Sequence, residues 1–497
     1  MEFEEKEPIK RTKKNVVFNL ANQILILVIP LILTPYLARV LHEEGNGQYA
    51  YSFSIITYFI IFANLGFDIY GQRKIAAYQD NKEITSRAFW EILILKIIFS
   101  SISFLIICII LLTFGFGKSY DLLILLLSIQ VISVPFDIQF LFKGKEQFSA
   151  IFLRTFIIKI VSTICIFLFV KTIDDLWKYV LFLSLSTFLS NIIMWISIKK
   201  YICFVPIKDL ELKRHLKPAI SIFLPSLIYT LYSIFDRTMI GLLINNADYE
   251  NGCYEQAFKI NNVILLFVIV LSPVLVSRNA NEYKKKGIDS IKNNLYFSAN
   301  YIWLISLPLI VGVNVLAGNI SAWFLGDGYE KVPMLLQIMS IRLVTAGFTS
   351  ALGGELFIAI GKEQYFTLST IIALVVNIVL NLILIPYYGA VGAAATTAFS
   401  EIVMMAILCF IVQKGKYISL LKIFKLSWKY IIASIIMFFP IYFINSAMNY
   451  SILSFIICTI CGAITYYIVL VVLRDKFVLS ISKKIISKVL KKEKSYE

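Results

Sequence analysis

Residues 89–114 read FWEILILKIIFSSISFLIICIILLTF, an apolar run in which only Glu91 and Lys96 are charged. About 20 consecutive apolar residues in helical form cross the hydrocarbon core of a bilayer. Inside that core only a helix or a closed barrel satisfies every backbone polar group. The strands of a barrel would alternate apolar and polar residues over about ten positions, and this run does not. The stretch therefore predicts a membrane-spanning helix.

Similar apolar runs recur along the whole chain, separated by short charged stretches. The sequence is 59% hydrophobic and 16% charged, whereas a soluble domain has about 25% charged residues. The fold class expected is an all-α polytopic membrane protein with about fourteen transmembrane helices. The predicted spans are 16–38, 48–68, 89–114, 121–142, 148–170, 177–198, 218–243, 254–276, 298–317, 333–360, 365–385, 390–412, 429–445 and 452–473.

The net charge of +16 invites a nucleic-acid interpretation, but the distribution of the charges argues against it. Most of the Lys and Arg residues lie before the first span, after each even-numbered span and at the C-terminus. Basic residues concentrate in cytoplasmic loops, so this pattern predicts an even number of spans with both termini in the cytoplasm. No nucleic-acid partner is expected.

Two short sequence matches indicate an internal duplication. Gly144-Lys145-Glu146-Gln147 follows the fourth span and Gly361-Lys362-Glu363-Gln364 follows the tenth, while segments 47–51 and 252–256 begin the second and eighth spans. Each pair is six spans apart, which predicts two pseudo-symmetric six-helix lobes with the substrate path between them, as in transporters built from parallel repeats. The expected domains are an N-lobe (1–200), a cytoplasmic linker (201–217), a C-lobe (218–413), and a segment with two further helices and a basic tail (414–497).

The sequence lacks the features of an enzyme. No Gly-rich phosphate-binding loop precedes a helix, which argues against an ATPase. His42 and His215 stand alone at loop edges, and the seven Cys residues lie mostly within apolar runs, so neither a disulfide framework nor a metal site is expected from them. We expect no catalytic residues and no cofactor.

Ionisable side chains inside spans are costly and usually mark a transport path or a buried pair. If the basic ones face a shared cavity, that cavity suits an anion such as a diphosphate. The predicted substrate-binding residues are Arg39, Lys96, Arg154, Lys159, Arg237, Lys259 and Arg342. Two alternatives remain: Glu91, Lys178 and Glu355 lie near span ends and can reach the membrane surface, and Asp236–Arg237 and Asp137–Arg154 can form structural pairs.

A second set of polar residues predicts an ion-coupling site. Asn377 and Asn381 are four residues apart and share one helix face. They lie at a depth similar to that of Asp236 and of Thr396 or Thr397. One carboxylate and several neutral oxygens suit a hard monovalent cation, although Asn and Thr also join membrane helices by hydrogen bonds. The predicted ion-coupling residues are Asp236, Asn377, Asn381, Thr396, Thr397 and Glu401, with Na⁺ or H⁺ as the coupling ion.

Several of these motifs resemble one family. Its N-terminal signature is similar to Pro35-Tyr36-Leu37-Ala38-Arg39-Val40-Leu41, Gly47-Gln48-Tyr49-Ala50, Asn64-Leu65-Gly66-Phe67 and Tyr70-Gly71-Gln72-Arg73, and its span-7 signature to Asp236-Arg237-Thr238-Met239-Ile240-Gly241. The chain resembles the Wzx-type oligosaccharide flippases, in the polysaccharide-transport branch of the multidrug/oligosaccharidyl-lipid/polysaccharide superfamily. The resemblance covers essentially the whole chain.

The resemblance implies a two-lobed fold that moves lipid-linked sugar precursors across the bacterial cytoplasmic membrane by alternating access, with undecaprenyl diphosphate as the usual carrier. A related lipid II flippase implies a sodium site at Asp236, Asn377, Asn381 and Thr397 or Thr396. This chain departs from that pattern, because an Asn stands where an acidic ligand on span 11 is expected.

The resulting hypothesis is an ion-coupled flippase for a polyprenyl-diphosphate-linked glycan. It would work as a monomer among membrane lipids, with polysaccharide-synthesis proteins as candidate partners. The first alternative is a cation-coupled drug or metabolite exporter of the same superfamily. The second is a membrane enzyme such as a polysaccharide polymerase or ligase, although such enzymes carry a long external loop that this chain lacks.

Overall fold

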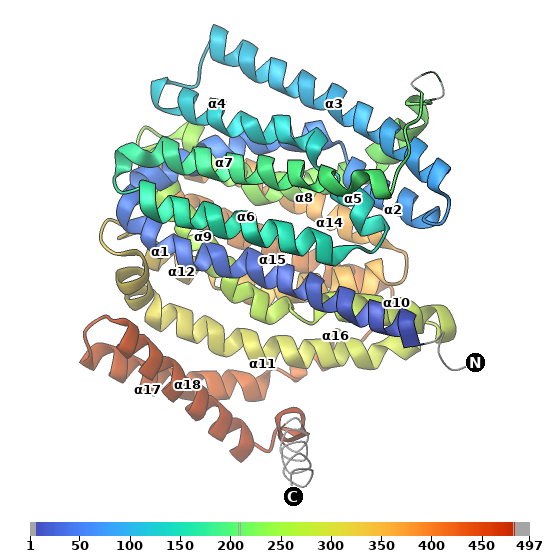
Figure 1. The fold of residues 1–497 in the computed structure, drawn as a ribbon. Coiled ribbons are helices and arrows are strands. Elements are labelled where there is room, and N and C mark those ends of the chain that lie inside the picture. The colour runs from blue at the N-terminus through green and yellow to red at the C-terminus, as the bar shows by residue number, and fades with distance from the viewer. Residues whose placement is uncertain (1–5, 207, 209, 481, 483–497) are drawn as a thin grey trace, which may run out of the picture. The chain divides into compact units, whose positions relative to one another are not determined.

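The structure is a computed structural model that describes residues 6–206, 208, 210–480 and 482, with the backbone alone over 6–28 and at 118, 148–150, 153, 225, 226 and 229. Every regular element within these residues is helical, as the apolar runs predict (Figure 1). Eleven segments of the described chain are long and apolar enough to cross a membrane. Some of these segments contain more than one helix, and the predicted count of fourteen spans stays an expectation. The basic tail from residue 483 onward lies outside the described residues.

The chain divides into two compact units, Met1–Gly252 and Cys253–Glu497. The helices of the first unit are α1 (Lys6–Asn64), α2 (Phe67–Ala77), α3 (Lys82–Thr113), α4 (Lys118–Ser133), η1 (Val134–Phe136), α5 (Gln139–Gly144), α6 (Phe148–Phe169), η2 (Ile173–Asp175), α7 (Leu176–Ile193), η3 (Met194–Lys200) and α8 (Lys213–Leu243).

The second unit begins within α9. Its helices are α9 (Ala247–Ile269), α10 (Ser272–Lys286), α11 (Asp289–Ile320), the π-helix η5 (Ser321–Leu325), α12 (Val332–Met339), α13 (Arg342–Thr349), the π-helix η6 (Ser350–Ile358), α14 (Glu363–Tyr388), α15 (Ala390–Lys414), α16 (Leu420–Lys425), α17 (Trp428–Ala447) and α18 (Ile452–Val472).

Helix α1 joins the first two predicted spans across a kink at His42, where φ is 52° and ψ is −174°. Asn46 stabilises the kink, because its Nδ2 donates to the carbonyl oxygens of His42 (2.7 Å) and Leu37 (3.1 Å). Carbonyls that the break leaves without helical partners are thereby satisfied.

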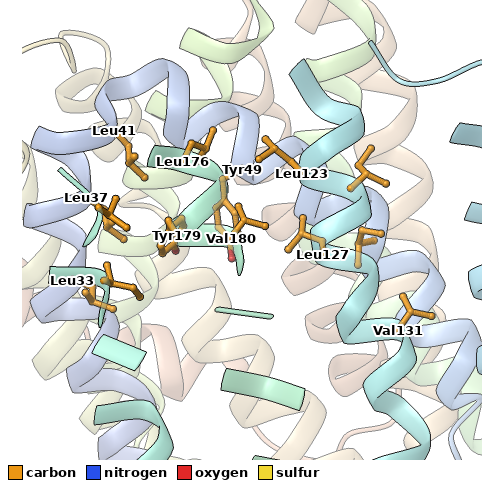
Figure 2. Packing of buried hydrophobic residues seen from close by; sticks show 14 of the residues in the cluster. Leu33, Leu37, Leu41, Tyr49, Leu123, Leu127, Val131, Leu176, Tyr179 and Val180 are labelled. Atoms are coloured by element: carbon orange, nitrogen blue, oxygen red, sulfur yellow. The ribbon is translucent and has the colours of Figure 1, made fainter. Parts of the chain in front are cut away.

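One apolar cluster holds α1, α4 and α7 together in the first unit (Figure 2). Its residues repeat every fourth position along a helix, which places them on one face. On α1 these are Leu33, Leu37 and Leu41, and on α4 they are Leu123, Leu127 and Val131. Leu176, Tyr179 and Val180 of α7 complete the layer.

Helix α8 is the first helix of the predicted second copy, yet it groups with the first unit. Hydroxyl contacts attach it to α1: Thr238 Oγ1 lies 2.9 Å from Ser54 Oγ and 2.6 Å from Tyr58 Oη. A β-carbon on Gly241 would lie 2.0 Å from the ring of Tyr51, so only glycine allows this close packing.

The two matching segments 47–51 and 252–256 begin at glycines that make equivalent contacts. A β-carbon on Gly47 would lie 1.8 Å from the carbonyl oxygen of Asp248, and one on Gly252 would lie 1.9 Å from that of Glu43. Each glycine therefore packs against the backbone four residues before the other one.

Helices α17 and α18 lie side by side in the second unit and pack mainly on α11 (Figure 1). Asn319 of α11 donates to Asn445 Oδ1 (3.2 Å) and to Ser454 Oγ (2.7 Å). Tyr466 Oη donates to the carbonyl oxygen of Leu304 (3.0 Å). These contacts attach the two additional helices through polar groups.

Candidate functional site

Lys96 lies at the centre of a partly buried polar cluster in the first unit. Its side chain is fully buried, and its Nζ donates to Asp68 Oδ1 and to the carbonyl oxygen of Asp137, both at 2.7 Å. Asn64 Nδ2 donates to the other carboxylate oxygen of Asp68 at 2.7 Å. The spacing of Asn64 and Asp68, four residues apart, is the sequence signal that could have identified this partner. The ammonium of Lys96 is already neutralised by a carboxylate.

Arg154, on α6, still has an N–H group that can donate a hydrogen bond. Its Nη2 donates to Ser197 Oγ at 2.7 Å, and the guanidinium lies 5.3 Å from the ring centre of Phe142. Its Nη1 is buried and has no hydrogen-bond partner among the described residues. The alternative pairing with Asp137 is wrong, because no ion pair joins these two described residues. Asp137 Oδ1 accepts from the backbone N–H of Gln139 (3.0 Å).

The other predicted basic residues have different environments. Lys159 is half-buried on α6 and makes no ion pair with any described residue. Arg39 is exposed on α1, and its Nη1 donates to the carbonyl oxygen of Pro35 (3.3 Å). Arg237 Nη1 donates to the carbonyl oxygen of Ser233 (2.7 Å). Lys259 Nζ lies 3.2 Å from Glu255 Oε1, one turn away on α9.

Arg342 and Glu401, predicted for two different roles, form one buried ion pair in the second unit. Arg342 Nε donates to Glu401 Oε1 at 2.9 Å, and both residues are nearly fully buried. Thr345 Oγ1 donates to Glu401 Oε2 at 3.1 Å, and Arg342 Nη1 donates to Asn261 Oδ1 at 3.1 Å. The hydrogen bonds around the pair offset the desolvation of its two charges.

The predicted neutral ligands of a cation gather between α14 and α15. Asn381 Nδ2 donates to Asn377 Oδ1 at 3.1 Å, and the hydroxyl of Thr396 donates to Asn381 Oδ1. Thr397 Oγ1 lies 3.3 Å from Tyr254 Oη. All four predicted side chains are buried, and we call Asn377, Asn381 and Thr396 the amide node. Asp236 is also buried but belongs to the first unit, so the complete sodium site stays a prediction.

His215 and Glu91 form a buried cluster that the sequence did not reveal. His215, expected at a loop edge, and Glu91, expected near the membrane surface, have fully buried side chains 2.5 Å apart at Nε2 and Oε2. Arg214 Nη2 (2.6 Å) and the backbone N–H of Glu211 (2.7 Å) also donate to Glu91. Burial lowers the pKa of His215, although the contact with Glu91 opposes the shift. The cluster ties the end of the predicted linker to α3.

Comparison with known proteins identifies the family of this chain. The family model described as "Polysaccharide biosynthesis protein" matches residues 12–276, more than half of the chain. Two relatives carry the name "Putative O-antigen transporter". The one from Shigella dysenteriae is 23% identical and covers 76% of this chain and 93% of its own length. The one from Escherichia coli (strain K12) is 22% identical and covers 81% and 97%.

Two solved structures show the fold. The lipid II flippase MurJ in an inward closed conformation has a TM-score of 0.73 and 18% identity, over 93% of this chain and 99% of its own. An inward-facing multidrug resistance transporter of the MATE family, in the MOP superfamily, has a TM-score of 0.60 and 16% identity, over 83% and 95%. With the family model matching over half its length, this multi-pass helical membrane protein belongs to the polysaccharide biosynthesis protein family.

Proposed function

We propose that this protein is a flippase that moves a polyprenyl-diphosphate-linked oligosaccharide from the cytoplasmic to the outer leaflet of the bacterial cytoplasmic membrane. It works by cation-coupled alternating access, with both termini in the cytoplasm. One observation carries the proposal over the drug-exporter alternative. The fold similarity to the lipid II flippase extends over 93% of this chain, against 83% for the multidrug transporter, and has the higher TM-score.

The contacts of the basic residues indicate which of them would bind the diphosphate. Arg154 has a buried guanidinium nitrogen with no described partner, and Lys159 forms no described ion pair, so an anionic headgroup would supply what both lack. A guanidinium also matches two phosphate oxygens at once. Lys96 and Arg342 already have carboxylate partners, so we assign them the role of holding the helices in place around the path.

The cation would bind at the amide node with Asp236. Neutral amide and hydroxyl oxygens plus one carboxylate make a ligand set that suits a monovalent hard ion. Gly392 allows α14 and α15 to pack closely there, because a β-carbon on it would lie 2.7 Å from the carbonyl oxygen of Leu384. We further propose that the protein works as a monomer among membrane lipids and receives its cargo from polysaccharide-synthesis proteins.

Translocation in proteoliposomes tests the proposal. The probe is a fluorescent undecaprenyl-diphosphate oligosaccharide, and its movement is measured with and without an imposed Na⁺ gradient. Arg154→Ala should slow movement roughly tenfold or more, since a charge-assisted hydrogen bond contributes about 1.5–3 kcal/mol. Lys292→Ala, which removes a half-buried Lys that pairs with Asp289 (2.7 Å), is the matched control and should move the probe at the normal rate.

Two results would contradict the proposal. Normal translocation by Arg154→Ala and by Lys159→Ala would remove the assigned headgroup contacts. Absence of glycan movement together with export of cationic dyes would support the drug-exporter alternative instead.

A further inference from the structure

Glu355 is a buried carboxyl group within a π-helix. It lies in η6, and only 2% of its surface is exposed. The sequence placed it near a span end, where it could reach the membrane surface, but the structure encloses it. Gly353 contributes to this, because a β-carbon there would lie 2.2 Å from the ring of Phe366 on α14, and glycine lets that ring pack against η6. Single π-turns in helices often occur at functional positions.

A hydroxyl group is the described hydrogen-bond partner of the Glu355 carboxyl. Ser298 Oγ, on α11, donates to Oε2 at 2.6 Å. On α10, the hydroxyl of Ser272 accepts from Ser350 Oγ of η6 at 2.8 Å. The carboxyl is therefore hydrogen-bonded by a neutral group.

The other buried carboxylates of the second unit have cations beside them. Glu401 pairs with Arg342 at 2.9 Å, Glu255 with Lys259 at 3.2 Å, and Asp475 lies 4.0 Å from Lys429 Nζ. Among the described residues, Glu355 forms no ion pair, which distinguishes it from these three.

None of the described charged groups on the elements around η6 forms an ion pair with Glu355. Arg278 of α10 pairs with Glu282 (2.8 Å), and Lys292 of α11 pairs with Asp289 (2.7 Å). Arg342 of α13 pairs with Glu401 of α15. The remaining ones are Tyr283, Lys284, Lys285 and Lys286 on α10, Tyr296 and Tyr301 on α11, Glu363, Tyr365, Tyr387 and Tyr388 on α14, and Cys409 and Lys414 on α15. No described cation among them pairs with Glu355.

A row of polar side chains leads from Glu355 toward the lysine-rich end of α10. Asn279 Nδ2 donates to the carbonyl oxygen of Glu355 (2.9 Å), and Asn294 Nδ2 donates to both Asn279 Oδ1 and Glu282 Oε2 (2.8 Å each). Glu282 is 32% exposed and its partner Arg278 is 60% exposed. The row therefore joins the backbone of Glu355 to an exposed ion pair at the end of α10.

An ionised carboxylate without a cation is costly in a buried site within the membrane, and binding a proton removes that cost. We propose that Glu355 is a proton-binding site of the transport cycle, taking up a proton on its carboxylate in one state and releasing the proton in another. This inference rests on the proposed function for its link to transport. The step forms and breaks one O–H bond and needs no oxidant or reductant.

Infrared spectroscopy of the purified full-length protein tests proton binding without any substrate. A protonated carboxyl gives a C=O stretch that shifts in D₂O. The expected result is a band that disappears as the pH is raised, is absent from Glu355→Gln and is retained in Asp327→Asn, which removes an exposed carboxylate as the matched control. Absence of the band from the unmodified protein, or its persistence in Glu355→Gln, would overturn the proposal.

A second variant keeps the test decisive if Glu355→Gln does not fold. Ser298→Ala retains the carboxyl and removes its closest donor, so it should change the pH at which the band disappears. An unchanged pH in a folded Ser298→Ala protein would contradict the assignment of the band to Glu355.

Transport separates this inference from the proposed function. In proteoliposomes with an imposed pH gradient, the unmodified protein should move the lipid-linked probe faster, and Glu355→Gln should lose that acceleration. An equal acceleration in Glu355→Gln would overturn the coupling role. If the probe does not move at all while the infrared band behaves as expected, the cargo assignment fails and the proton site stands.

Discussion

Gly47 and Gly252 make the same contact in reverse: each packs against the backbone carbonyl four residues before the other, at Asp248 and Glu43. Because the two residues begin matching segments 47–51 and 252–256, the contact relates equivalent positions of the two predicted copies. Such a reciprocal pair is what two identical subunits form across a two-fold axis. The matching sequence positions therefore correspond to matching structural positions.

Alanine at either glycine should destabilise the protein strongly. The added β-carbon would overlap a backbone oxygen at 1.8 or 1.9 Å, and overpacking of this kind costs about 1–3 kcal/mol or more. We expect Gly47→Ala and Gly252→Ala each to lower the melting temperature of the detergent-solubilised protein. Gly312→Ala, where nothing lies within 4 Å, is the control and should leave it unchanged. Unchanged melting of Gly47→Ala would contradict the close approach.

The Arg342–Glu401 pair should show strong coupling in a double-mutant cycle. Removing one partner of a buried pair leaves an uncompensated charge and costs about 3–5 kcal/mol. We expect Arg342→Met and Glu401→Leu each to lower the melting temperature markedly, and the combined variant to recover much of the loss. Additive losses in the combined variant would show that the two side chains act independently.

Glu91 should control how firmly the linker is held to α3. Glu91→Gln keeps the side-chain shape but weakens the bonds from Arg214 and His215, so the chain near Lys208 and Lys213 should become more sensitive to trypsin. The rate of limited proteolysis measures this effect. Glu83→Gln, at an exposed position of the same helix, should be cut at the normal rate, and equal cutting of both variants would count against the anchoring role.

Sodium should stabilise the protein through the amide node. If Asn381 and Thr396 help to bind the ion, the melting temperature should rise with NaCl relative to choline chloride, and Thr396→Val or Asn381→Ala should abolish the rise. Thr459→Val, on an exposed part of α18, should retain it. A rise that survives both node substitutions would show that the ion binds elsewhere.

The sequence predicts the helices well because each apolar run must satisfy its backbone internally. It does not predict features that depend on contacts outside the apolar runs, such as the ends of helices. The predicted span 89–114 begins late, since Asn81 caps α3 by accepting from the N–H of Ile84 (3.0 Å) and the helix extends beyond the apolar run. The match between segments 144–147 and 361–364 is also less regular in structure than in sequence. The left-handed residue of the turn is Glu146 (φ 56°) in the first copy and Gly361 (φ 72°) in the second, two places apart in the aligned segments.

Partners far along the chain also decide the roles of the charged residues. Arg342 and Glu401 could be recognised as intramembrane charges, but their pairing joins α13 to α15 and no local pattern encodes it. The same holds for His215, whose environment depends on Glu91 of α3. Asn377, Asn381 and Thr396 were predictable because two of them share one helix face and the third follows on the next helix.

The attachment of α17 and α18 to α11 bears on how the protein is made. These helices follow α11 in the chain by more than 100 residues, so α11 is made before them. Asn319, Asn445 and Ser454 supply the hydrogen bonds of that attachment, each contributing about 0.6 kcal/mol in a membrane. The hydrogen bonds that recognise this helix pair are thus few and individually weak, so the insertion of α17 and α18 depends on packing against a helix that is already in place.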